Sequence, residues 1–156
     1  MTARSFGLPI GAFALLTAAW VTGAASQNLS SNEPRSMSNV ELVRAFVDAF
    51  NRKSIDEMLR MTSDDIVWLS VDGETIGVET RGQDALRHSM MEYFGKVQIV
   101  KSELTLIESL GPYVTTHERA VGSRQPGTPV PASVAVYEIR DSLIRRVWYY
   151  PAVTAP

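Results

Sequence analysis

The chain has 156 residues, with 15 basic and 17 acidic side chains and no cysteine. This length suits one domain with a core of its own, and the near balance of charge gives no electrostatic case for binding nucleic acid or an anionic membrane surface. The absence of cysteine excludes disulfides, thiolate nucleophiles and Cys-ligated metals, and two histidines are too few for a His-rich metal site. We therefore expect neither a metal nor a cofactor.

Residues 1–25 are typical of a secretory signal peptide. Arg4 supplies a positive start, residues 6–21 are almost wholly apolar, and the small residues that follow suit cleavage after Ala24 or Ala25. The alternative is an uncleaved membrane anchor, although the apolar run is shorter than the roughly 20 residues of a spanning helix. The pattern predicts an exported protein, periplasmic or secreted, with no membrane attachment after cleavage.

A single domain is expected over residues 38–153, after a disordered linker at 26–37 that is rich in Ser and Asn. Its first helix should begin at Ser38, because Ser38 and Glu41 have the spacing of a capping box. The apolar residues that follow recur at helical spacing and should face the core. They are Val43, Phe46, Val47 and Phe50.

A second helix should follow at once, since Ser54 and Glu57 have the spacing of another capping box. Alternating residues at 66–71 then predict a strand, the Asp72-Gly73 pair predicts a turn, and residues 74–80 form a short returning strand. A third helix follows Gly82. Its apolar stripe comprises Leu86, Met90, Tyr93 and Phe94.

Residues 97–108 should form a long strand in which the apolar positions change from one face to the other. A strand has a period of two, so this change requires an inserted residue, and we expect a β-bulge near Lys101 and Ser102. Bulges bend sheets. A bent sheet with three helices across its open side would enclose a cavity, which is a common ligand site.

Three antiparallel strands should complete the sheet, over 113–121, 133–140 and 143–150. With Asp141 and Ser142 as the turn, Arg140 faces Leu143, Ile139 faces Ile144 and, further along, Glu138 faces Arg145. This register puts apolar side chains on the face away from the helices. We expect a homodimer to cover that face, or else the tail at 151–156 to fold back over it. The side chains are Val134, Val136, Val147 and Tyr149.

Several of these segments together resemble the nuclear transport factor 2-like superfamily, and within it the SnoaL-like polyketide cyclases and the limonene-epoxide-hydrolase group. The resemblance implies an α+β fold: a cone-shaped, strongly bent, mixed or antiparallel sheet covered by three N-terminal helices around an internal cavity, with dimerisation through the sheet. The residues that carry it are Trp68-Leu69-Ser70, 81–86, His117-Glu118-Arg119, 137–141 and 147–150.

The catalytic residues of these relatives are mostly missing. Where the epoxide hydrolases carry Tyr-x-Asn, Arg-x-Asp and a final Asp, this chain has Trp68-Leu69-Ser70, Arg119-Ala120-Val121 and Tyr150. Without either aspartate no base activates water, so epoxide hydrolysis is not expected. Ketosteroid isomerases need an Asp base, whose position aligns with Ser70, and we find no carboxylate that aligns with the cavity.

The position of the family's arginine places Arg119 and His117 on the cavity face of the central strand, together with Tyr113, Thr115 and Val121. His117 would shuttle a proton, and Arg119 would stabilise an enolate or carboxylate oxygen. The alternatives without a catalytic role are that His117 is a structural histidine and that Arg119 forms an internal ion pair. The expected ligand-binding walls are Trp68, Ser70, Tyr137, Trp148 and Tyr150, beside Ser133 and Ala135.

Two functions therefore remain open. One is an exported, cofactor-independent isomerase, cyclase or lyase, which acts by acid–base chemistry on a small carbonyl or cyclic compound. The other is a non-catalytic dimeric module of the same fold, used for ligand binding or interaction. In both, the partner is a small hydrophobic molecule that carries a carbonyl or carboxylate.

Overall fold

The computed structural model describes residues 37–96, 101–122 and 130–154. Nearly all of the leader and linker segments, and the first four residues of the strand expected from 97, lie outside these ranges. No helix within them is long and apolar enough to cross a membrane. The elements are α1 (Asn39–Asn51), α2 (Ile55–Arg60), β1 (Thr62–Asp72), β2 (Thr75–Arg81), α3 (Gln83–Lys96), β3 (Lys101–Leu110), β4 (Tyr113–Val121), β5 (Pro131–Arg140) and β6 (Leu143–Thr154).

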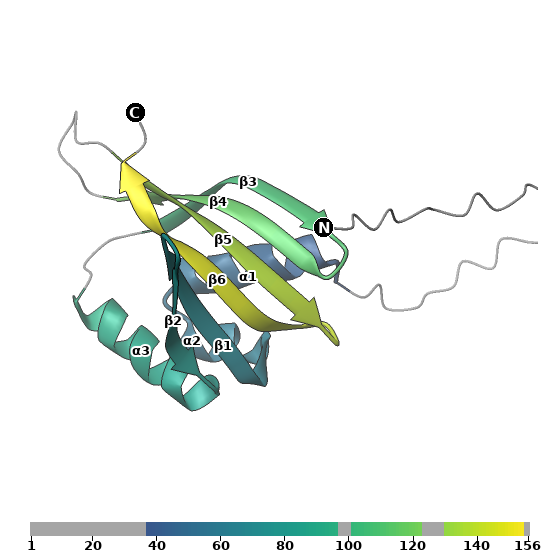
Figure 1. Ribbon diagram of the computed structural model, residues 1–156. Coiled ribbons are helices and arrows are strands. Elements are labelled where there is room, and N and C mark those ends of the chain that lie inside the picture. The colour runs from purple at the N-terminus through teal and green to yellow at the C-terminus, as the bar shows by residue number, and fades with distance from the viewer. Residues whose placement is uncertain (1–36, 97–100, 123–129, 155–156) are drawn as a thin grey trace, which may run out of the picture. The chain divides into compact units, whose positions relative to one another are not determined.

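The six strands form one mixed sheet in the order β2-β1-β6-β5-β4-β3, in which β1 and β6 run parallel and every other pair is antiparallel. The sheet is bent and does not close on itself, so β2 and β3 are its edges (Figure 1). Helix α1 packs on β3 and β4, and α3 packs on β1 and β2. These observations confirm the α+β fold expected from the sequence.

The first helix begins as predicted, but the second does not use its serine in the same way. Ser38 Oγ accepts a hydrogen bond from the Glu41 amide, and Ser38 N–H donates to the Glu41 carboxylate at 2.7 Å, so the capping box is complete. Ser54 makes no side-chain cap, and that prediction is wrong. In the tight corner between the helices, Ser54 has a ψ of 80° instead of the extended 159° of Ser38.

Two adjacent residues form hydrogen bonds that hold the junction between β2 and α3 against the rest of the domain. Gly82 has a φ of +85°, which suits glycine, and its N–H donates to the Ile66 carbonyl at 2.7 Å. The Gln83 amide nitrogen donates to the carbonyls of Leu59 and Thr62 at 3.0 and 2.9 Å. The predicted β-hairpin and third helix are both present, with the turn at Gly73 and Glu74.

The bulge in β3 lies further along the strand than predicted. Ser102 pairs regularly with Ala120, and the register shifts between Leu104 and Leu106. Thr105 is the extra residue, and its hydroxyl donates to the His117 carbonyl at 3.2 Å. The predicted position near Lys101 is therefore wrong. The observed bulge separates Leu104, which pairs with Glu118, from Leu106, which pairs with His117, so it is not the change of apolar face that was predicted before Leu104.

The turn between β5 and β6 matches the prediction, but the register beyond it does not. Asp141 and Ser142 both have positive φ, and the pairs Arg140 with Leu143 and Ile139 with Ile144 are present. A bulge between Glu138 and Ile139 then shifts the pairing by one residue. The predicted pairs beyond this point are wrong. The observed pairs are Glu138 with Arg146, Tyr137 with Val147, Val136 with Trp148, Ala135 with Tyr149 and Val134 with Tyr150.

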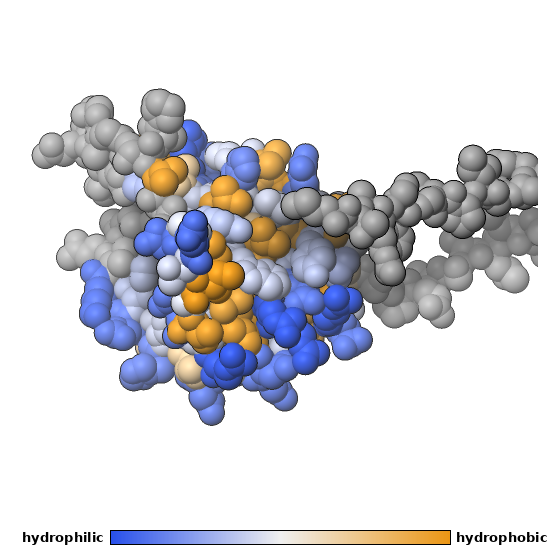
Figure 2. All heavy atoms as spheres, viewed as in Figure 1, coloured by the Kyte–Doolittle hydropathy of each residue, from blue (hydrophilic) through white to orange (hydrophobic). Residues whose placement is uncertain are grey.

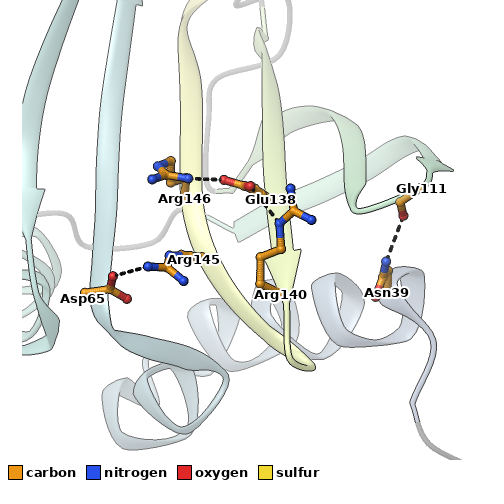
Figure 3. A network of polar contacts seen from close by, with 7 residues as sticks. All are labelled: Asn39, Asp65, Gly111, Glu138, Arg140, Arg145 and Arg146. Atoms are coloured by element: carbon orange, nitrogen blue, oxygen red, sulfur yellow. Dashed lines mark hydrogen bonds and ion pairs between the residues drawn. The ribbon is translucent and has the colours of Figure 1, made fainter.

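Ion pairs account for this bulge (Figure 3). The Glu138 side chain is only 6% exposed and accepts from Arg146 at 2.5 Å and Arg140 at 3.0 Å. The bulged Arg145 instead reaches Asp65 on β1 at 2.8 Å. As a result, Tyr149 and Val147 face the helices, and Trp148 lies on the other side of the sheet.

Candidate functional site

A cavity of about 260 Å³ lies between the helices and the sheet, on the face that α1 and α3 cover. Helix α1 contributes Phe46, Val47 and Phe50 of its predicted apolar stripe, and β1, β5 and β6 contribute aromatic side chains. The lining residues are Phe46, Val47, Phe50, Trp68, Met90, Tyr93, Lys101, Ser102, Glu118, Ala120, Pro131, Ser133, Tyr137 and Tyr149.

Aromatic rings form most of the inner wall. The ring of Phe46 lies 6.4 Å from that of Trp68 and 6.1 Å from that of Tyr137, between centroids, and Trp68 lies 6.3 Å from Tyr149. These are tilted or edge-to-face contacts of the kind that aromatic side chains prefer. The wall is therefore well packed.

Glu118 is the only acidic residue among the described lining residues, and it is 9% exposed. One carboxylate oxygen, Oε1, accepts hydrogen bonds from the Thr116 hydroxyl at 2.8 Å and from the Tyr137 hydroxyl at 2.9 Å. The other, Oε2, accepts from the Ser102 hydroxyl at 2.8 Å. All three donors are neutral, and hydrogen bonds to an ionised carboxylate are stronger than those between neutral groups.

Asn51, the last residue of α1, fixes the position of Ser102. Its amide nitrogen donates to the Ser102 carbonyl at 2.9 Å, and its amide oxygen accepts from the Ser102 N–H at 2.7 Å. Both backbone groups of Ser102 are thus tied to the helix. The hydroxyl that contacts Glu118 is consequently held in place from two sides of the cavity.

A second hydroxyl pair lies in the same wall. Tyr149 donates to Ser133 Oγ at 2.7 Å. Burial raises the pKa of Tyr149, and the negative charge of Glu118 adds to this effect. Burial, again with the charge of Glu118, raises the pKa of Tyr137 well above its usual value. Both phenols therefore remain protonated hydrogen-bond donors at neutral pH.

Of the residues expected at the site, the structure brings Trp68 and Tyr137 together in the cavity wall. Ser133 also lines the cavity as expected. Ser70 lies outside the lining and donates to Glu79 at 2.6 Å. The bulge in β6 turns Trp148 and Tyr150 away from the cavity, and Tyr149 takes the position expected for them.

His117 and Arg119 lie on the opposite face of β4, so the face assigned to this strand is wrong. His117 is exposed. The Arg119 side chain is 46% exposed and forms an ion pair with Glu103 on β3 at 2.7 Å. The face of β4 that packs inward instead carries Thr116 and Glu118.

The missed residue is thus Glu118, and the expectation that no carboxylate reaches the cavity is corrected. A signal for it existed in the sequence. The alternate positions of β4 hold Val114, Thr116, Glu118 and Ala120, with one ionisable side chain, whereas the other set holds two, His117 and Arg119. The set with fewer ionisable side chains is the better candidate for burial.

Within residues 37–96, 101–122 and 130–154, no group of three or more His, Asp or Glu side chains is arranged to hold a metal ion. The described lining of the cavity offers one carboxylate, the ammonium group of Lys101 and several hydroxyls. It can accept or return a proton and donate hydrogen bonds to an oxygen.

Comparison with solved structures places this architecture among known folds. A cystatin-fold protein of Novosphingobium aromaticivorans superposes with a TM-score of 0.63 at 24% identity, over 72% of this chain and 97% of that one. A protein of Kribbella flavida proposed to be a ketosteroid isomerase gives 0.60 at 18% identity, over 75% and 80%. A protein of Xanthomonas campestris proposed to be a polyketide cyclase gives 0.52 at 21% identity, over 70% and 86%.

No curated protein matches the sequence significantly. The sequence model of the SnoaL-like domain, in contrast, matches residues 43–147, which run from α1 to β6 and include every described lining residue of the cavity except Tyr149. The solved structures share the fold, and the family model spans most of the domain. The chain therefore belongs to the SnoaL-like domain family.

Proposed function

We propose that the cavity binds a small, largely apolar cyclic or carbonyl compound and that Glu118 moves a proton on it, as in a cofactor-independent isomerase, cyclase or lyase. The observation that supports this most directly is the buried Glu118 carboxylate among aromatic rings. A mostly apolar pocket with a few convergent polar groups is the usual form of a small-molecule site. The proton shuttle predicted for His117 passes to Glu118 in this proposal.

The hydrogen bonds of Glu118 leave room for a substrate. A carboxylate has about four lone-pair sites, and three of them are occupied by the hydroxyls of Thr116, Tyr137 and Ser102. The remaining site would take a proton from a carbon next to a carbonyl and return it elsewhere on the molecule. The Ser133 hydroxyl, which accepts from Tyr149 and so keeps its own proton to donate, would donate to the oxygen on which negative charge develops.

Deuterium exchange tests this chemistry without knowledge of the natural substrate. Small cyclic ketones incubated with the protein in deuterated water should gain deuterium beside the carbonyl, as followed by NMR. Glu118→Gln should slow the enzymatic exchange roughly 100-fold or more, because general acid–base catalysis contributes about that factor. Glu103→Gln makes the same change outside the cavity and should leave the exchange rate unaltered. Exchange that survives Glu118→Gln would remove Glu118 from the proposal.

A second candidate function is ligand binding without catalysis. It is favoured by the same hydrogen bonds, since three donors on one carboxylate also describe a structural network. Ketones or alcohols that raise the melting temperature of the wild-type protein, with no deuterium exchange under the same conditions, would select this function.

The outer face of the sheet supports a homodimer as part of the proposal. Apolar side chains gather on this face over β1, β2 and β6, between charged side chains (Figure 2). Ile76, Val78 and Tyr150 are 61%, 55% and 43% exposed. A continuous apolar surface of this kind is unusual on a monomer. A second copy of the chain, packed sheet to sheet, would cover it.

We also propose that the domain acts after export, in the periplasm or outside the cell. The support is the composition of residues 1–25 alone. Mass spectrometry of the protein recovered from its native host should give a mature N-terminus at Ala25 or Ser26. An intact N-terminus in a membrane fraction would point to the anchor instead.

A further inference from the structure

The charge of the cavity indicates which kind of ligand it binds. Glu118 is buried, and its partners among the described residues are the neutral hydroxyls of Thr116, Tyr137 and Ser102. None of the ion pairs within 37–96, 101–122 and 130–154 includes it. Buried carboxylates are usually paired with a cation, because desolvation of a single charge is costly. Among the described residues, the negative charge of Glu118 in the cavity therefore has no cationic partner.

The aromatic rings around this charge also favour a cationic partner. The face of an aromatic ring carries negative electrostatic potential, so it attracts ammonium groups, most strongly where water is excluded. Six aromatic side chains line the cavity: Phe46, Phe50, Trp68, Tyr93, Tyr137 and Tyr149. Rings and carboxylate together form an environment that stabilises a cation and repels an anion.

Lys101 is the one positively charged side chain among the described lining residues. It is exposed and makes no ion pair with Glu118. A lysine keeps its ammonium group in water unless the gain from pairing exceeds the cost of desolvation. Lys101 thus does not neutralise the Glu118 carboxylate, which can still pair with a cationic ligand. The opposing hypothesis is that an anion binds near Lys101.

We propose that the ligand of this cavity is a small organic cation: an ammonium group, primary to quaternary, on a hydrocarbon body of about one or two rings. The inference rests on the proposed function for the position of the ligand. The size follows from volume, because a cavity of about 150 Å³ holds benzene and this one has about 260 Å³.

Binding of three matched probes to the full chain tests the inference. Benzylamine, which is an ammonium ion at neutral pH, benzyl alcohol and benzoate have similar shapes and differ in charge. By isothermal titration calorimetry, benzylamine should bind roughly 10- to 30-fold more tightly than benzyl alcohol, and benzoate most weakly. Phenyltrimethylammonium, which has no N–H group, should also bind more tightly than the alcohol, since the preference comes from charge and rings.

Two variants show which carboxylate causes the preference for benzylamine over benzyl alcohol. Glu118→Gln should abolish the advantage of benzylamine over benzyl alcohol while the alcohol still binds. Glu103→Gln, an identical change on the outer face of β3, should retain the advantage. If Glu118→Gln does not fold, the order of the probes on the wild-type protein decides the question alone.

The outcomes that overturn the inference are distinct from those that overturn the proposed function. If benzyl alcohol and cyclohexanone bind and benzylamine has no advantage, the cavity is a ligand site but the cation inference is wrong. If benzoate binds most tightly and Lys101→Met abolishes its binding, the site selects anions through Lys101. If none of the probes or ketones binds, the proposed use of the cavity fails as well.

Discussion

At the scale of single residues, Tyr137 and Tyr149 offer a matched comparison. Each donates one hydrogen bond in the cavity wall, Tyr137 to the Glu118 carboxylate at 2.9 Å and Tyr149 to the Ser133 hydroxyl at 2.7 Å. A bond to a charged acceptor contributes about 1.5 to 3 kcal/mol, and a neutral one about 0.5 to 1.5 kcal/mol. The two phenols should therefore contribute unequally to stability.

Tyr137→Phe should lower the free energy of unfolding by about 2 kcal/mol and Tyr149→Phe by about 1 kcal/mol. The substitutions remove the same atom and keep the ring, so the difference reports on the acceptor. Urea unfolding at one protein concentration measures both. An equal or larger loss for Tyr149→Phe would show that the hydrogen bond from the Tyr137 hydroxyl to Glu118 contributes little to the free energy of unfolding.

Glu138 gives the domain a pH-dependent ion pair on the opposite side of the sheet. Burial acts to raise the pKa of Glu138, but hydrogen bonds from Arg146 and Arg140, and their charges, outweigh it and hold the pKa below its usual value. A carboxyl whose pKa is lower in the folded state stabilises the fold above its unfolded pKa of about 4.3. That contribution is lost as the pH falls through the folded pKa.

Glu138→Gln should therefore cost about 1 to 2 kcal/mol at pH 7 and progressively less as the pH falls from 5 to 3. Glu103→Gln is the control, because both partners of its ion pair are about half exposed and such pairs contribute about 0 to 1 kcal/mol. Denaturant unfolding across this pH range measures both differences. A Glu138→Gln cost that does not change with pH would contradict the assignment.

The sequence indicated which residue types line the cavity, but not which face of β4 they come from. Trp68 was found from the position of a family motif on the first strand, and Tyr137 and Ser133 were found because they share one face of the predicted β5–β6 hairpin. In β4 the face was assigned from the position of a family arginine, and this exchanged Glu118 for His117 and Arg119. One step along a strand reverses every side chain, so a single wrong anchor misplaces the whole set.

At the scale of elements, the two serines that precede α1 and α2 have the same sequence context and different roles. Ser38→Ala should lower the free energy of unfolding by about 1 kcal/mol, because it removes a formed capping box. Ser54→Ala should cost much less, since Ser54 makes no side-chain cap. Thermal and urea unfolding of the two variants compare them directly. Equal losses would mean that the Ser38 cap is not a main support of α1.

The order and type of the elements could be predicted from the sequence because helix periodicity, turn residues and strand composition are local. The positions of the bulges could not. The shift in β3 depends on pairing with β4, and the shift in β6 depends on Arg145 reaching Asp65, which is 80 positions away in the chain. Local sequence patterns do not predict such long-range contacts, yet these contacts determine which side chains of β6 face the cavity.

At the scale of the whole molecule, the apolar outer face predicts self-association. The wild-type protein should be a dimer by sedimentation or light scattering, and Val78→Glu should make it monomeric, because a buried unpaired charge is costly. Met91→Glu is the control. Met91 on α3 is 60% exposed, similar to Val78 at 55%, but lies on a different element. A monomeric wild-type protein at tens of micromolar would rule out this dimer.

The parallel pairing of β1 with β6 has a consequence for how the chain folds. Before β6 is available, β1 has only β2 as a partner, and β3, β4 and β5 form a separate group, because β6 alone joins the two in the order β2-β1-β6-β5-β4-β3. This closure joins segments far apart in sequence, and such contacts slow folding because loop entropy must be lost first. β6, the last strand of the sheet in chain order, is therefore the one that completes it. Folding of this domain should follow synthesis of β6 instead of accompanying synthesis of the earlier strands.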